Sequence, residues 1–353
     1  MNNTFLRYLT VSITLITRAY SQPAISSVSV PVSLLTKHVY ALTDDSFRGR
    51  ETGTTGQLKA AQYCVQSFRA SHLGSVFRVD SAYGSFYQPY FLSYSTISLV
   101  KTERGTLPLT YKRYELAPSP VTKWDSSQVV ASHNVAGLLI GTDLKQEVVV
   151  ISAHYDHLGY VEGRIHPGAD DNASGTASVL SIASVFDSLA RQGIRSRRTI
   201  LFALFSGEEK GLLGSRYFVH NSPIPVQQFA GNLNIDMVGR IDYKHRKKPE
   251  YCYLIAGPKD DQLRKLVSAA NKRSVAIELD YEHDSMNDSK QYFYRSDQYN
   301  FHNFGVPAVF FTDGEHPDYH RPTDTADRID YQILSKRATL VFQTAWLLAN
   351  PDS

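Results

Sequence analysis

A chain of 353 residues with 42% hydrophobic and 20% charged side chains has an ordinary globular composition, long enough for one large α/β domain or two smaller ones. The formal net charge of +3 is small for this length, which argues against nucleic acid or an anionic membrane as the partner. The basic run at 244–248 is best explained as a solvated loop between two strands.

The amino terminus resembles a secretory signal. A short apolar stretch at 8–16 follows Arg7, and the small residues Ala19 and Ser21 come next. We therefore predict a signal peptide at 1–21 and a secreted or periplasmic protein. The stretch is too short to span a bilayer, and no later segment has the length and apolarity expected of a membrane helix.

Two cysteines, Cys64 and Cys252, are too few for a disulfide framework. Two buried free thiols are expected, with a single bridge left open as the alternative. Their wide separation and the lack of a CxxC motif argue against zinc binding through thiolates.

Apolar residues at helical spacing predict helices over 30–42 and 56–70. The segment between them, DDSFRGRETGTTG, is rich in Gly and Thr and is predicted to be a loop. Residues at about 81–132 alternate weakly and contain many Tyr and Ser. We interpret this region as an excursion from a single domain that covers 22–353.

From residue 147 onward the pattern becomes that of a parallel sheet. Five nearly continuous apolar runs predict strands that are covered on both faces: EVVVISA, RTILFALFS, NLNIDMVG, YCYLIAG and VPAVFF. Helical patterns at 174–190, 260–272 and 331–348 are interspersed with them. This alternation predicts an α/β three-layer sandwich with a mostly parallel central sheet flanked by helices.

Potential metal ligands follow several of these strands. They are His154 and Asp156 in SAHYDHLG, Asp170 and Asp171 in GADDNASG, Glu208 and Glu209 in FSGEEKGLLGS, Asp236 in NIDMVG, and His320 in DYHRPTD. Because ligands of open parallel sheets bind beyond the carboxyl ends of the strands, we expect these side chains to converge. An oxygen-rich set with two imidazoles suits a pair of divalent metals, with zinc favoured and Co²⁺ or Mn²⁺ as possible substitutes.

The spacing of these residues indicates roles for some of them. Residues i and i+2 of an extended segment face the same side, so the Asp156 carboxylate can accept the second N–H of His154. The adjacent side chains of Glu208 and Glu209 must diverge. One of them can then bind metal while the other acts as general base on a water.

For three of the candidate ligands, a structural role or a neighbouring residue is an alternative to metal binding. Asp171 precedes a helix, where an aspartate often caps the helix N-terminus. Asp170 is a competing candidate for the metal-binding role of Asp171. Asp236 lies in an apolar strand and needs either a metal or a salt bridge, for which Arg240 is near in sequence. His316 competes with His320.

Taken together, these blocks and their order resemble the M28 family of zinc peptidases, which includes bacterial secreted aminopeptidases. The similarity extends from about residue 30 to 329 and is densest from His154 onward. It implies two zinc ions, one held by His154 and Asp236 and the other by Glu209 and His320, with Asp171 bridging them because it lies three residues before the Ser-Gly pair at 174–175. It further implies that Glu208 is the general base and that Asp156 orients His154.

The resemblance also implies finer features. A cis peptide is expected at Asp156–His157. Many secreted relatives insert a protease-associated domain before the HxD motif, but the chain is too short there, so a single catalytic domain is expected. Gln298 stands where many relatives have a histidine, which bears on the substrate pocket rather than on the metal. The aromatic residues Tyr292, Phe293, Tyr294 and Tyr299 are candidates for the wall of a hydrophobic side-chain pocket.

The function implied is that of a metal-dependent exopeptidase that removes amino-terminal residues from peptides through a dizinc-activated water. Carboxypeptidase or dipeptidase specificity is one alternative, and a glutaminyl cyclase-type transferase with one zinc is another. A non-catalytic ectodomain of the transferrin-receptor type is a third, but such chains lose ligands or the base, and this chain retains all of them. The oligomeric state is not predicted.

Overall fold

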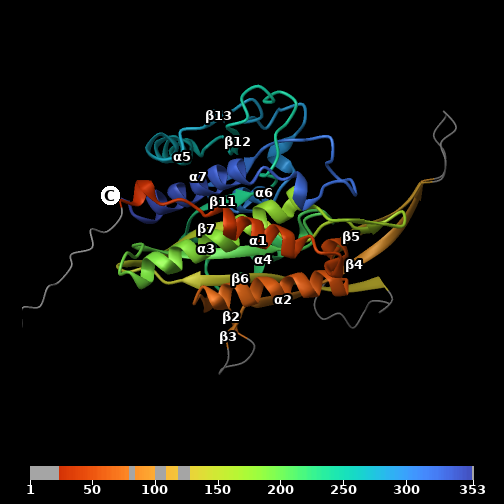
Figure 1. The fold of residues 1–353 in the computed structure, drawn as a ribbon. Coiled ribbons are helices and arrows are strands. Elements are labelled where there is room, and N and C mark those ends of the chain that lie inside the picture. The colour runs from red at the N-terminus through yellow and green to blue at the C-terminus, as the bar shows by residue number, and fades with distance from the viewer. Residues whose placement is uncertain (1–23, 79–83, 100–108, 118–127, 352–353) are drawn as a thin grey trace, which may run out of the picture.

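The computed structural model describes residues 24–78, 84–99, 109–117 and 128–351, so the predicted signal peptide at 1–21 lies outside it. In this part of the chain a ten-stranded sheet forms the centre of the protein (Figure 1). Its order is β13-β12-β14-β11-β7-β10-β6-β4-β5, and the short β1 also pairs with β6.

The strands of this sheet have the following bounds, from one edge to the other: β13 (Glu278–Asp280), β12 (Tyr251–Ala256), β14 (Ala308–Thr312), β11 (Phe229–Ile235), β7 (Leu144–His154), β10 (Arg198–Phe205), β6 (Val129–Leu139), β4 (Tyr87–Leu99) and β5 (Leu109–Leu116), with β1 (Gly74–Ser75) beside β6. Two small hairpins pair β2 (Phe77–Arg78) with β3 (Gly84–Ser85), and β8 (Gly159–Val161) with β9 (Arg164–His166).

The central strands β14, β11, β7 and β10 run parallel, as the sequence predicts. All five apolar runs form strands of this sheet. The antiparallel members are β12 on one side, and β6, β4 and β5 on the other. Strands β4 and β5 come from the region interpreted as an excursion, and they extend the main sheet rather than folding apart from it.

Seven helices of the described residues cover the sheet: α1 (Val32–Leu42), α2 (Thr55–Ala70), α3 (Gly175–Arg191), α4 (Leu213–Asn221), α5 (Asp261–Arg273), α6 (Gln298–Asn303) and α7 (Tyr331–Ala349). Shorter helical turns occupy Ile25–Ser27, Asp45–Arg50, Ala169–Ser174, Val226–Gln228, Tyr292–Tyr294 and Ala326–Arg328. The five helices predicted from periodicity are confirmed to within two residues. The short α4 and α6 were not predicted.

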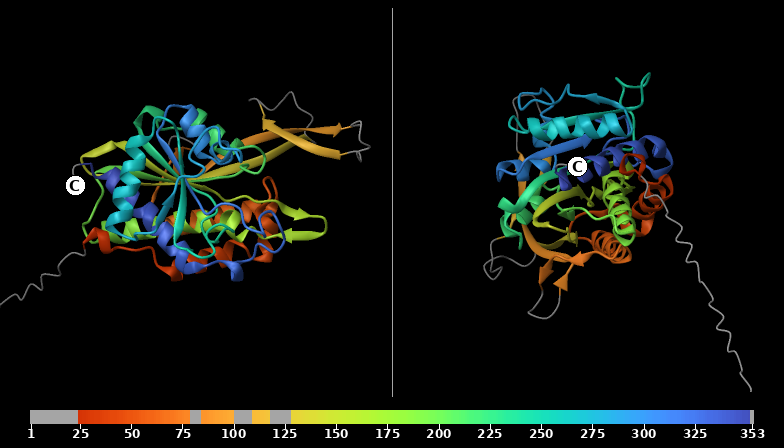
Figure 2. Two further views of the ribbon diagram at one scale, coloured as in Figure 1. Left: turned by 90° about the horizontal axis from the view of Figure 1, so that it is seen from above. Right: turned by 90° about the vertical axis from the view of Figure 1, so that its left-hand side faces the viewer.

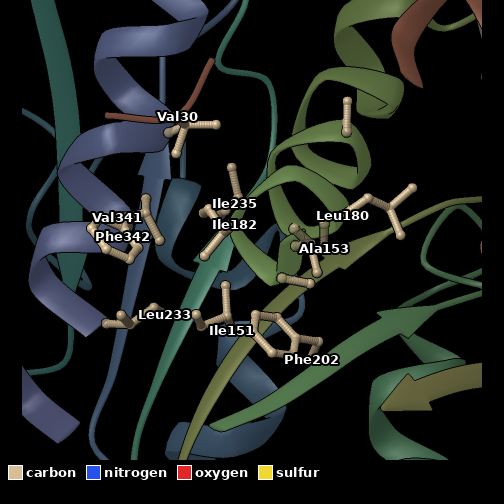
Figure 3. Packing of buried hydrophobic residues seen from close by; sticks show 14 of the residues in the cluster. Val30, Ile151, Ala153, Leu180, Ile182, Phe202, Leu233, Ile235, Val341 and Phe342 are labelled. Carbon is tan, nitrogen blue, oxygen red and sulfur yellow. The ribbon is translucent and has the colours of Figure 1, made fainter. Parts of the chain in front are cut away.

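Both faces of β7 are buried, which explains its unbroken apolar run. Ile151 and Ala153 point into the larger core under α1, α2, α3, α5 and α7, whereas Val148 and Val150 point into a smaller core under α4 and α6. Figure 3 shows the larger core, where Ile182 of α3 and Phe342 of α7 lie over the strands. Cys64 and Cys252 are both free and buried, as expected.

Helix α3, together with the turn before it, spans Ala169–Arg191 and is long and apolar enough to cross a membrane by length and composition. Its most apolar window is 83% buried inside the protein, so core packing accounts for its apolarity.

Beyond the body of the protein, the β8–β9 hairpin and the long strands β4 and β5 extend in the same direction (Figure 2).

Candidate metal centre

The predicted ligands all leave the sheet at the carboxyl ends of its parallel strands, or lie in loops that return there. Their positions are as follows: His154 ends β7, Glu208 and Glu209 follow β10, Asp236 follows β11, His320 follows β14, and Asp171 lies in the turn before α3. The distances below show that this topology brings the six side chains together.

Asp171 lies between two imidazoles. Its Oδ1 is 3.5 Å from His154 Nε2, and its Oδ2 is 2.9 Å from His320 Nε2. Each imidazole has a further carboxylate beside it, because His154 Nε2 is 3.2 Å from Asp236 Oδ1 and His320 Nε2 is 3.5 Å from Glu209 Oε2. The side chains therefore form two groups, with the Asp171 carboxylate next to both.

Buried polar atoms in these groups lack ordinary partners. His154 Nε2 and Asp236 Oδ1 make no hydrogen bond among the described residues, although both are buried. Leaving such atoms unsatisfied costs about 1–3 kcal/mol each. A cation between them would satisfy both atoms. The unpartnered atoms therefore indicate a metal site independently of the resemblance.

The buried carboxyl groups of the cluster also favour a bound cation. Burial raises the pKa of Glu208 well above its usual range, and the nearby carboxylates of Glu209 and Asp236 raise it further. Burial likewise raises the pKa of Glu209. Several acids that converge in a buried space repel one another, and a divalent ion held by nitrogen and oxygen ligands removes that repulsion.

Glu208 and Glu209 diverge, as their adjacency requires. Glu208 Oε2 lies 3.8 Å from His154 Nε2, on the side of Asp236. Glu209 points the other way, toward His320. Glu208 therefore lies with His154 and Asp236 in one possible metal-binding group, while Glu209 belongs to the other.

The part played by Asp156 differs from the expectation. His154 Nδ1 lies 3.2 Å from the backbone oxygen of Asp156 but 3.7 Å from its carboxylate Oδ1, so the carbonyl is the hydrogen-bond acceptor. The carboxylate instead accepts hydrogen bonds from Thr52 Oγ1 at 2.6 Å and from the Glu208 backbone N–H at 3.3 Å. Asp156 thus connects the His154 loop to the Glu208 loop.

One imidazole of the site, that of His157, was not predicted from the sequence. His157 Nδ1 is 2.8 Å from Glu209 Oε1 and 3.8 Å from Asp171 Oδ2, so with these two residues it forms a possible metal-binding group. Burial lowers the pKa of His157 to about 3, which leaves its imidazole neutral at ordinary pH. The signal was the second histidine of HYDH at a strand end, three residues after His154.

The competing aspartate and histidine lie elsewhere. Asp170 Oδ2 is 3.2 Å from His316 Nε2, and Asp170 Oδ1 accepts a hydrogen bond from the Gly239 N–H at 2.7 Å. Asp170 and His316 therefore pair with each other and not with the residues around Asp171.

The salt-bridge alternative for Asp236 is wrong. Arg240 binds Asp318 at 2.7 Å, while Asp236 Oδ2 accepts a hydrogen bond from Ser296 Oγ at 2.6 Å.

The expected cis peptide is also corrected. It lies at Asp171–Asn172 and not at Asp156–His157. The expectation had attached this bond to the wrong aspartate of the site.

A cavity opens beside the cluster. Tyr292, Met237, Phe310 and Thr312 line it together with the acidic residues. Of the four aromatic candidates, Tyr292 alone lines this cavity, whereas Phe293, Tyr294 and Tyr299 pack against Ile255 in a small core. Gln298 is buried and donates a hydrogen bond to the Phe293 carbonyl at 2.9 Å, so it does not contribute to the cavity wall.

Comparisons with known proteins identify the family of this chain. The model of peptidase family M28 matches residues 134–345, which is more than half of the chain. Aminopeptidase YwaD of Bacillus subtilis (strain 168) is 30% identical over 218 residues, which cover 60% of this chain and 43% of that protein. The chain spans about half the length of the curated relatives it matches.

Two solved structures show the same fold. BSAP, a zinc aminopeptidase from Bacillus subtilis, has a TM-score of 0.61 at 18% identity, with 92% of this chain and 97% of that chain covered. The glutaminyl cyclase of Fimbriiglobus ruber has a TM-score of 0.57 at 14% identity, with 93% and 99% covered. With the family model spanning the loops that carry His154, Asp171, Glu208, Asp236 and His320, the chain belongs to peptidase family M28.

Proposed function

We propose that this protein is a zinc-dependent aminopeptidase with two metal ions in its centre. The observation that carries the proposal is the Asp171 carboxylate, whose two oxygens face His154 and His320 separately. In this proposal His154 and Asp236 hold one ion, Glu209 and His320 hold the other, and Asp171 bridges them. His157 lies close enough to Glu209 to take part in the second group.

Zinc bound there would polarise the scissile carbonyl and lower the pKa of a water from about 15.7 to about 7. Glu208 accepts the proton of the attacking water and then delivers it to the departing amine. The hydrogen bond from the Glu208 N–H to Asp156 holds the backbone of this base in place.

The charges of the cavity favour the amino end of a peptide. Its wall carries the acids Asp171, Glu208, Glu209 and Asp236. Among the described lining residues, Arg295 supplies a guanidinium that could bind a carboxylate, but Glu315 already pairs with it at 2.7 Å. A free peptide carboxylate would therefore meet a guanidinium that Glu315 already neutralises, which argues against carboxypeptidase action.

The experiment that tests this proposal combines metal quantification with a peptide library. We expect about two zinc ions per chain, replaceable by Co²⁺ or Mn²⁺, and cleavage that stops when the amino terminus is acetylated but persists when the carboxyl terminus is amidated. One ion per chain with cyclisation of amino-terminal glutamine would instead support the glutaminyl cyclase alternative. Cleavage that tolerates acetylation would refute the aminopeptidase proposal.

The cavity wall also predicts a preference for the residue that is removed. Tyr292, Met237 and Phe310 present apolar surface beside the acids. Burial of one additional large apolar side chain contributes about 1.5–3 kcal/mol. Amino-acid anilides with Leu, Met or Phe are therefore expected to have at least about tenfold higher kcat/KM than those with Gly or Asp. Equal rates across the panel would contradict an apolar pocket.

The proposal extends to cell location and domain organisation. We infer that residues 1–21 are removed on export and that 22–353 work as one secreted or periplasmic domain. The apolar stretch at 8–16 supports export, and the continuity of β4, β5 and β6 within the main sheet supports a single domain.

A further inference from the structure

The glycine- and threonine-rich loop before α2 lies directly against the metal centre. It is outside the residues matched by the family model, and the sequence analysis predicted for it nothing beyond a loop. Residues 49–52 of this loop are called the clamp segment below. A Cβ at Gly49, which has φ +68°, would lie 2.4 Å from His166 O and 2.7 Å from Gly159 O, so the chain can approach this closely only with glycine there.

Arg50 of the clamp segment is fully buried and binds backbone carbonyls rather than a carboxylate. Its Nε donates to Tyr155 O at 2.8 Å, its Nη1 donates to Pro167 O at 2.7 Å, and its Nη2 donates to Gly168 O at 3.0 Å. Tyr155 is the residue after His154, and Gly168 lies three residues before Asp171. One planar guanidinium thus links the two loops that carry these ligands.

The charge of Arg50 acts in the same direction as its hydrogen bonds. Burial lowers the pKa of the guanidinium to about 10, while nearby Asp156 and Asp171 favour the charged form. Arg50 therefore remains positive at neutral pH and attracts the carboxylates that otherwise repel one another in the cluster.

Thr52 joins a third loop to the other two. Its hydroxyl donates to Asp156 Oδ2 at 2.6 Å and accepts a hydrogen bond from the Gly207 N–H at 3.0 Å. Both directions follow from the chemistry, because an ionised carboxylate only accepts and a backbone N–H only donates. Gly207 immediately precedes Glu208, so Thr52 sets the spacing between the His154 loop and the Glu208 loop.

Glu51 adds a weaker link of the same kind. Its Oε1 lies 3.0 Å from Lys210 Nζ, and Lys210 directly follows Glu209. The Glu51 side chain is one-third exposed, and such partly solvated pairs contribute little energy. Arg50 and Thr52 therefore carry most of the connection.

We propose that Arg50 and Thr52 are positioning residues of the metal centre, which hold the loops of His154, Asp171 and Glu208 at the spacing that metal binding requires. Neither side chain belongs to the groups of candidate ligands, so they act through the residues they hold. The proposal rests on the metal centre of the proposed function. It adds a segment about a hundred residues upstream of the first ligand as a determinant of metal affinity.

Thr52→Val tests the proposal because it keeps the shape of the side chain and removes the hydroxyl. Loss of an outer hydrogen-bond partner of a metal site typically costs 10–100-fold in metal affinity. We expect Thr52→Val to weaken zinc binding by about that factor, measured by competition with a chromogenic chelator, and Thr52→Ser to restore it.

Thr344→Val is the matched control. Thr344 is buried like Thr52, and its hydroxyl donates to the Leu340 carbonyl at 2.8 Å within α7. A merely structural role for Thr52 predicts that both valine variants lower the Tm and that neither changes zinc affinity, an outcome that would overturn the proposal. A wild-type protein that binds no divalent metal would instead refute the proposed function.

Arg50→Lys gives a second measurement that needs no metal. Lysine keeps the charge but cannot reach the same set of carbonyls with one planar group. In hydrogen exchange of the metal-free protein, we expect amides at 155–157 and 169–172 to exchange faster than in the wild type, with α7 unchanged. Unchanged exchange in these two segments would contradict the linking role of Arg50. If this variant does not fold, the Thr52 series still decides.

Discussion

Glu208→Gln is expected to keep its metal and to lose turnover by about 10²–10⁴-fold, which is the usual contribution of a general base. Glutamine has nearly the same shape but cannot take a proton from water at neutral pH. Because the proposal assigns the metal beside His154 to His154, Asp236 and Asp171, replacement of Glu208 leaves the proposed ligand set intact. The measurement is kcat for an unblocked peptide beside the zinc content per chain.

Glu209→Gln is the control for this prediction. It is the adjacent acid, and burial raises the pKa of both carboxyl groups. Glu209 faces His320 and His157, so its replacement should lower metal content as well as turnover. Wild-type activity in Glu208→Gln, or equal metal loss in both variants, would contradict the assignment of Glu208 as the base.

Asp171→Asn is expected to lower the metal content to one ion or fewer per chain and to reduce turnover to near background. The asparagine amide replaces one of the two oxygens that face His154 and His320 with a donor that cannot bind a cation. It also removes the shared negative charge between the two groups. Metal per chain and kcat are measured on the same preparation.

Asp170→Asn serves as the neighbouring control. Asp170 is also buried but pairs with His316, so this change is expected to lower stability and to leave the zinc content unchanged. If Asp170→Asn loses zinc as readily as Asp171→Asn, the bridging role is assigned to the wrong aspartate. A full metal complement in Asp171→Asn would contradict the shared-carboxylate arrangement itself.

Sequence periodicity predicted the parts of the fold whose burial is repeated along the chain. β7 and β10 are apolar on both faces, and α3 and α7 are long, so each has many residues that carry the same signal. Helices α4 and α6 have nine and six residues, which is too short for a clear helical period. The carboxyl-end rule for parallel strands then predicted where the ligands would meet.

What the residue types determined by themselves was the inventory of the site: nitrogen and oxygen ligands at strand ends, in an order that resembles family M28. Tertiary structure decided which of two adjacent aspartates lies in the site. The side chains of Asp170 and Asp171 leave the same turn in different directions, so Asp171 faces His320 and Asp170 faces His316. It also decided the contacts of Arg50 with Tyr155 and of Thr52 with Asp156, which lie more than a hundred residues away. Local pattern carries no record of such contacts, since they depend on where separate loops come to lie once the sheet has formed.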